Sequence, residues 1–312
     1  MKFKIDNMFT KKLLHLSLSL AVLCTVLSLS SCGEETANSN GDHGNDDIQV
    51  QETTDQSSTQ RVEAVKQIFN TIPSPIEMAS LIRKSGADFD NSILNSTDNA
   101  DNYTSVRQQA LNLGVYGADL SYASMFEQQQ QSIYYLSAAR GLAKQLGVED
   151  AINNDLIERV NDNRNNKDSL LRIVADAYYS LNGYLKESDR EQVSALVIAG
   201  GWIEALHLAT THVTPDNQKL KERIAEQKYS LKDLITLLET YEGAPELGNV
   251  ITDLKGIQEV FNLVEIKKGK TETSRDNSGK MVIGGASSIT MSDETLEAIK
   301  MKIQDVRSSY IK

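Results

Sequence analysis

The sequence predicts an all-α protein, either a helical bundle or an irregular stack of helical hairpins, with one short β-hairpin-like insertion near residues 267–290. Three observations favour helices. Apolar residues recur at three- and four-residue spacing from Arg61 to the C-terminus. The 312 residues include only 4 prolines, and none lies between Pro75 and Pro215. Aromatic residues, which are typical of strands, make up only 6% of the chain.

Each helix is expected where this spacing is bounded by capping residues. The expected helices span 61–73, 75–85, 103–146 with an interruption at 127–131, 149–161, 167–187, 189–212, 216–228, 230–242, 246–266 and 292–311. Ser74 and Pro75 are typical of a helix start, and Gly86 and Gly147 of helix ends. Further N-caps are expected at Asn166 or Asp168, at Ser188 or Asp189, at Ser230 and at Ser292.

Two glycines lie inside the longest expected helix, where glycine is unfavourable and its presence requires an explanation. Gly114 and Gly117 each cost about 1 kcal/mol relative to alanine within a helix. Close approach of a neighbouring helix backbone is the compensation we expect, and a kink in the helix is the alternative.

The insertion near residues 267–290 is the one stretch that breaks the helical pattern. Residues 271–274 and 280–283 are expected to pair as a hairpin around Asp276-Asn277-Ser278-Gly279.

A tetratricopeptide-like organisation is an alternative for the middle of the chain. The segment from Tyr178 through Gly201-Trp202 to Thr214-Pro215-Asp216-Asn217 resembles one tetratricopeptide unit. Residues 193–200 are longer than that repeat permits, and no 34-residue period recurs along the chain.

The N-terminus has the pattern of an export signal. Four lysines precede an apolar run from Leu13 to Leu29, which is shorter than the roughly 20 residues that a transmembrane helix needs. A basic start, an apolar middle and a small-residue exit are typical of a secretory signal peptide.

The residues Leu29-Ser30-Ser31-Cys32 resemble the lipobox of bacterial lipoproteins. The resemblance implies cleavage before Cys32 and attachment of acyl chains such as palmitate to that residue, so that the protein is anchored to a membrane. Gly33-Glu34-Glu35 is similar to an acidic cluster that follows this cysteine in some lipoproteins of Bacteroidota. That similarity implies an outer-membrane location, at either the cell surface or the periplasmic face.

Cleavage would leave three parts: a discarded signal peptide (1–31), an acylated Cys32 with an acidic tether (32–60) and a helical domain (61–312). The signal peptide has four lysines and one aspartate, so its removal changes the net charge from −11 to −14. Seven acidic residues and no Lys or Arg lie in 33–60, and apolar residues are rare there, so we expect this tether to be disordered. Cys24 leaves with the signal peptide, and the body then has no free thiol.

The run Ala110-Leu111-Asn112-Leu113-Gly114-Val115-Tyr116-Gly117-Ala118-Asp119-Leu120-Ser121-Tyr122-Ala123 and the segment 72–94 resemble uncharacterised helical lipoproteins of Bacteroidota. This resemblance implies no known activity.

Composition and motifs exclude several functions and select none. A net charge of −11 argues against nucleic-acid binding. Glu204-x-x-His207 has the spacing found in di-iron bundles, but no second copy of the motif exists, and His212 lies on another face of the same helix. We therefore expect no catalytic residue, no metal and no cofactor, and hence a non-enzymatic protein that binds an envelope protein or glycan.

The alternative is a cleft that binds a glycan or a peptide. Its candidate polar residues are Asp119, Arg140, Arg172, Asp176, Glu204 and His207, all of which lie within apolar helical segments. Nearby tyrosines would line the cleft. An ordinary i,i+4 pair between Arg172 and Asp176 explains part of this set without any ligand.

Overall fold

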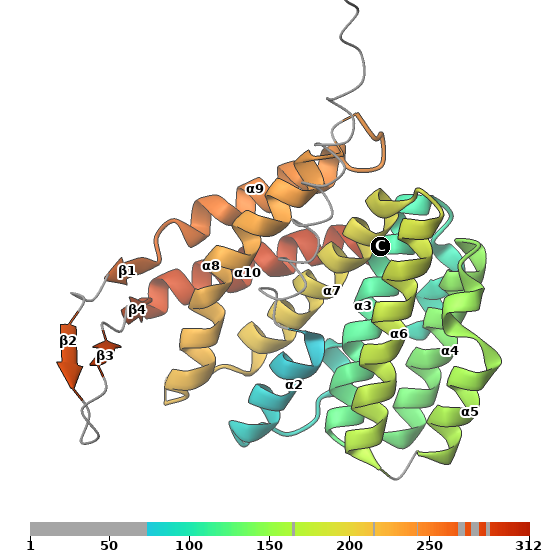
Figure 1. The fold of residues 1–312 in the computed structure, drawn as a ribbon, viewed down its shortest axis with the longest axis horizontal. Helices are drawn as coiled ribbons and strands as arrows, with labels where there is room; N and C mark the ends of the chain where they lie inside the picture. The colour runs from blue at the N-terminus through green and yellow to red at the C-terminus, as the bar shows by residue number, and fades with distance from the viewer. Residues whose placement is uncertain are drawn as a thin grey trace, which may run out of the picture. The chain divides into compact units, whose positions relative to one another are not determined.

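The computed structural model confirms the all-α fold (Figure 1). It describes residues 74–163, 166–214, 216–241, 243–267, 272–275, 281–284 and 288–312. The expected signal peptide, the acidic tether and the first expected helix (61–73) lie outside the described residues.

Nine α-helices make up most of the described chain. They are α2 (Pro75–Lys84), α3 (Val106–Met125), α4 (Gln129–Gln145), α5 (Asn154–Asp162), α6 (Lys167–Glu187), α7 (Glu191–His212), α8 (Gln218–Glu239), α9 (Gly248–Phe261) and α10 (Asp293–Tyr310). Three short 3-10 helices are also described, η1 (Asn91–Ile93), η2 (Thr97–Asn102) and η3 (Glu149–Ile152). Both η1 and η2 belong to the 85–105 loop, which joins α2 to α3.

Local capping explains where many of these helices begin and end. The side chain of Ser74 accepts a hydrogen bond from the backbone N–H of Glu77 at the start of α2. Asn166 caps α6 and Ser292 caps α10 in the same way, as expected. Gly147, with a φ of +68°, follows the end of α4.

Two expected boundaries are wrong. Ser230 does not start a helix, because α8 runs without a break from Gln218 to Glu239 and buries Ser230. Neither Ser188 nor Asp189 caps α7: the N-cap position is Arg190, which makes no capping bond through its side chain. At Ser230, burial of a continuous apolar face overrides the local capping preference. Ser188 instead occupies the C-cap position of α6, and Asp189 follows it with a φ of +54°.

The core is organised around α7 (Figure 1). Every residue from Val193 to Thr210 except Ile198 is buried, and α7 packs on α2, α3, α6, α8 and α10. Among the described helices, α7 alone is long and apolar enough to cross a membrane, yet 94% of its most apolar window is buried inside the protein. Its hydrophobicity is therefore that of a core helix.

The backbones of α3 and α7 approach one another closely where the two helices cross, and glycines make this possible. A Cβ on Gly114 would lie 2.0 Å from the carbonyl oxygen of Val197, and a Cβ on Gly200 would lie 1.9 Å from that of Leu111. Close backbone approach is thus the reason for Gly114, as expected. Gly117 differs, because a Cβ there would meet the hydroxyl of Tyr178 from α6.

The insertion forms two short antiparallel pairs of strands. β2 (Glu272–Arg275) pairs with β3 (Met281–Gly284), with Thr273 opposite Ile283, which confirms the expected hairpin with a shift of one residue at each strand. The second pair, β1 (Glu265–Lys267) with β4 (Ser288–Thr290), was not expected from the sequence.

The hairpin of α6 and α7 does not have the dimensions of a tetratricopeptide unit. The two helices contain 21 and 22 residues. Together they exceed a 34-residue repeat, which accommodates both helices and their turns.

Candidate functional site

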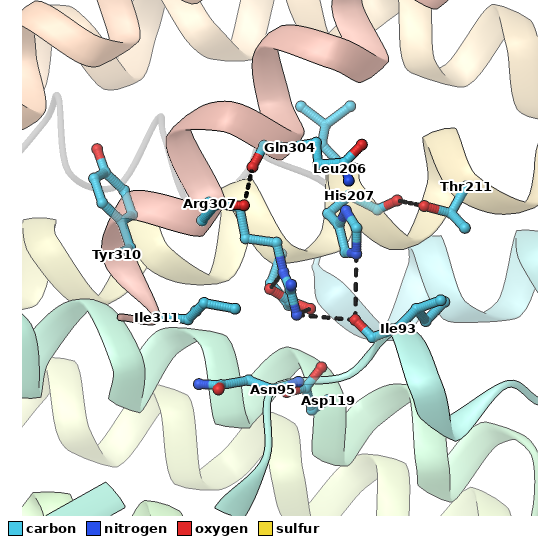
Figure 2. A network of polar contacts seen from close by, with 12 residues as sticks. Ile93, Asn95, Asp119, Leu206, His207, Thr211, Gln304, Arg307, Tyr310 and Ile311 are labelled. Atoms are coloured by element: carbon cyan, nitrogen blue, oxygen red, sulfur yellow. Dashed lines mark hydrogen bonds and ion pairs between the residues drawn. The ribbon is translucent and has the colours of Figure 1, made fainter. Parts of the chain in front are cut away.

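Charged and amide side chains meet in the interior, between α3, α7, α10 and the 85–105 loop (Figure 2). We call this group the buried polar cluster; it consists of Asn95, Tyr103, Asn112, Asp119, Glu204, His207 and Arg307. Asp119 and Glu204 have no exposed surface at all. Ionised groups in such a place are costly unless they are paired and hydrogen-bonded, so each partner matters.

A two-bond ion pair between Glu204 and Arg307 is the centre of the cluster. Arg307 Nε donates to Glu204 Oε2 over 2.5 Å, and Arg307 Nη2 donates to Glu204 Oε1 over 2.8 Å. The planar guanidinium thus matches both carboxylate oxygens. Burial disfavours the charged guanidinium, but Glu204 outweighs this effect and the pKa of Arg307 is raised. The pair joins α7 to α10 across the interior.

The 85–105 loop is held by the same pair through one carbonyl group. The oxygen of Ile93 accepts from Arg307 Nη2 over 2.9 Å and from His207 Nε2 over 3.2 Å (Figure 2). Because a carbonyl oxygen only accepts, Nε2 of His207 carries a hydrogen. Burial lowers the pKa of His207, partly offset by Glu204, so the neutral ring is favoured.

Asp119 brings a second carboxyl group to the ion pair. Its Oδ2 atom accepts from the backbone N–H of Asn95 over 3.2 Å, and its Oδ1 atom is buried with no donor among the described residues. The pKa of Asp119 is raised well above its ordinary value, first by burial and then by the charge of Glu204. With two carboxyl groups beside one guanidinium, the raised pKa favours the neutral form of Asp119. The charges of the three groups then balance.

Amide and phenol groups connect this centre to the end of the chain. Asn95 Nδ2 donates to Tyr103 Oη over 3.0 Å and to Asn112 Oδ1 over 3.2 Å. Asn112 Nδ2 donates to the carbonyl of Tyr310 over 2.8 Å, and Tyr103 Oη donates to that of Ile311 over 3.2 Å. These bonds satisfy carbonyl groups that the end of α10 would otherwise leave without partners.

Of the six polar residues predicted as a candidate site, the structure brings three together: Asp119, Glu204 and His207. The other three lie at the surface. Arg140 donates to Asn154 over 2.6 Å, Arg172 donates to Ser169 over 3.3 Å, and Asp176 pairs with Arg159 over 2.7 Å. The carboxyl group of Asp176, whose side chain is 58% exposed, thus shares no cleft with Asp119 and Glu204.

Sequence reasoning missed Arg307, the partner of Glu204. A signal for it exists in α10, where Ile299, Ile303, Val306 and Tyr310 form the buried face. Arg307 follows Ile303 by four residues and therefore points to the same side. A basic residue on the apolar face of a helix indicates a buried acidic partner. The spacing of residues along the helix does not identify which acidic residue that partner is.

The tyrosines expected to line a cleft are divided between core and surface. Tyr116, Tyr122 and Tyr135 are buried, whereas Tyr179 is 80% exposed. Tyr122 Oη lies 2.8 Å from Nε2 of His212, so the second histidine of α7 is part of a separate contact. Beside the buried polar cluster, the rings of Tyr103, Tyr116 and Tyr135 pack in the core, with centroids 6.4 Å and 6.0 Å apart in turn.

The chemistry available to the buried polar cluster is limited by its burial. No group of three His, Cys, Asp or Glu side chains in the described chain is placed to hold a metal ion. A general acid or base must also reach its substrate within hydrogen-bond distance. Asp119 and Glu204 instead contact one another, Arg307 and the 85–105 loop, and this arrangement stabilises the packing of α3, α7 and α10.

No protein-family model matches the chain, and neither a curated protein nor a solved structure matches it.

Proposed function

We propose that this protein is a lipid-anchored component of a bacterial cell envelope whose helical body binds an envelope protein or glycan without catalysing a reaction. The observation that carries the proposal is the sequence Leu29-Ser30-Ser31-Cys32 after a basic and apolar start. The acidic segment that follows would hold the body away from the membrane surface, at the outer membrane.

The geometry of the body supports a binding protein better than an enzyme. Asp119 and Glu204 are the carboxyl groups with the most unusual setting, and both have an exposed fraction of 0%. Their bonding partners are Arg307 and Asn95, which come from this chain. A carboxyl group that is fully buried in the core is not available for proton transfer to a substrate.

The anchor is tested by replacing its cysteine. In cells fed radiolabelled palmitate, the wild-type chain should carry label and sediment with membranes. Cys32→Ala should lose the label and release the body. Cys24→Ala is the matched control, because it changes the other cysteine of the chain and should leave both properties unchanged. Label or membrane retention in Cys32→Ala would overturn the anchor.

The side of the membrane on which the body lies is a separate question. Protease added to intact cells should remove the body if it is displayed at the surface. Full protection in intact cells, with digestion after the outer membrane is permeabilised, would place it at the periplasmic face.

The binding function is tested by photo-crosslinking in living cells. The wild-type protein should give a specific crosslinked product with an envelope protein or glycan, and Cys32→Ala should give less of it because the body is no longer held at the membrane. A failure of both chains to form any specific product would contradict the binding function and leave the anchor intact.

A further inference from the structure

The protein also contains a cavity of about 40 Å³. Unlike the buried polar cluster, it is lined almost entirely by apolar side chains. It lies between α3, α4, η3, α5 and α6. Its walls include Leu113 and Leu120 of α3, Leu136 of α4, Leu156 and Val160 of α5, and Ile173 of α6.

The packing of the helices explains why space remains here. α4 packs on α3 and η3, and α6 packs on α3, α7, η3 and α5. α4 is thus joined to the α5–α6 pair mainly through α3 and η3, and the cavity occupies the wedge between them. It is partly open to the protein surface.

The walls of the cavity offer few hydrogen-bond partners to a bound water. Tyr178 supplies the one polar side chain of the lining, and its hydroxyl donates to the carbonyl of Gly114 over 3.1 Å. That hydroxyl is therefore engaged at the junction of α3 and α6. A bound water needs two to four polar partners, and a cavity without them stays dry and takes an apolar guest.

The size of the cavity selects among apolar guests. An apolar cavity that binds benzene has a volume of roughly 150 Å³. The space here is much smaller, so aromatic rings and fused ring systems do not fit, whereas a chain one carbon wide can enter from the open side. A polar head group would then remain in water.

We propose that this cavity binds the end of an unbranched alkyl chain, such as that of a fatty acid, between α4 and the α5–α6 pair. This site does not depend on acylation of Cys32, and its test is independent of the test of the anchor.

The test measures binding of radiolabelled dodecanoate, below its micelle concentration, by equilibrium dialysis against the full chain carrying Cys32→Ala. One dodecanoate should bind per chain. In a series of shorter fatty acids, the affinity should rise about fourfold for each methylene that enters the cavity. Dodecanol should bind comparably, since the head group stays outside.

Two substitutions on α6 provide a matched comparison. Ala177 lines the cavity, and Ala175 of the same helix is exposed. Ala177→Leu should fill the space and weaken dodecanoate binding by about tenfold or more. Ala175→Leu should leave it within about twofold of the parent chain. Ala177→Leu should also unfold at the same or a higher urea concentration, which separates a filled cavity from a damaged fold.

Three results would overturn the proposal. They are the absence of saturable dodecanoate binding, equal affinities for Ala177→Leu and Ala175→Leu, and an affinity that follows the charge of the head group and ignores chain length. The last result would indicate an ionic site at the surface.

Discussion

Arg307 of the last helix and Glu204 of the central helix form a buried ion pair across 103 residues of sequence, with Arg307 Nε and Glu204 Oε2 2.5 Å apart. The same guanidinium donates to the carbonyl of Ile93. One side chain thus connects α7, α10 and the 85–105 loop, so its loss should affect segments far from its own position.

Breaking this pair from one side should be costly. Glu204→Met or Arg307→Met should each lower the free energy of unfolding by about 3–5 kcal/mol, because an unpaired charge stays buried. The double variant should recover a large part of this loss. Urea unfolding measures all three. Arg159→Met, which removes the exposed pair with Asp176, is the control and should cost no more than about 1 kcal/mol. Additive losses in the double variant would contradict a coupled pair.

Asp119 should make stability fall as the pH rises. Its pKa is raised in the folded protein, so above about pH 4 the unfolded chain releases this proton while the folded protein keeps it. Stability from this group is therefore full below pH 4 and falls by about 1.4 kcal/mol per pH unit until the folded pKa is reached.

The variant Asp119→Asn isolates this effect, because an amide of similar size cannot titrate. At neutral pH it should be at least as stable as the wild type, and the difference between the two proteins should shrink toward pH 4. Urea unfolding across this range measures the difference. A wild-type protein whose stability parallels that of Asp119→Asn at every pH would show that Asp119 is ionised in the fold.

Gly200 should not accept a side chain. Because a Cβ would lie 1.9 Å from the carbonyl oxygen of Leu111, Gly200→Ala has to separate α3 from α7 and should cost about 1–3 kcal/mol or more. Gly141→Ala on α4 is the matched control: nothing lies within 4 Å of its Cβ, and helix propensity predicts a gain of about 1 kcal/mol. Equal effects of the two substitutions on unfolding would refute the close crossing.

Asn95 should hold the 85–105 loop in place. Asn95→Ala removes its bonds to Tyr103 and Asn112 and should cost about 1–3 kcal/mol, since their polar atoms lose a partner. Amide hydrogen exchange within this loop should become faster. Asn102→Ala, at an exposed position of the same loop, should leave exchange unchanged. Unchanged exchange in both variants would show that other contacts hold the loop.

Local sequence was sufficient for those parts of the fold that depend on neighbours in the chain. Ser74, Asn166 and Ser292 could be recognised as caps because each bonds to a backbone group three residues later. Ser230 has the same local pattern but lies inside α8, where its burial decides the outcome. A capping preference of about 1 kcal/mol is smaller than the free energy gained by packing a continuous apolar face.

By itself, the sequence determined the all-α class, most helix boundaries and the presence of acidic groups at Asp119 and Glu204 within apolar helices. Only the tertiary structure decided that these two carboxyl groups meet, that Arg307 neutralises the pair, and that Asp176 stays at the surface. The reason is physical: helical periodicity tells which residues face inward, but the crossing of α3, α7 and α10 sets which inward faces touch. The crossing of α3 and α7 depends on the close contact at Gly114 and Gly200, which are far apart in the chain.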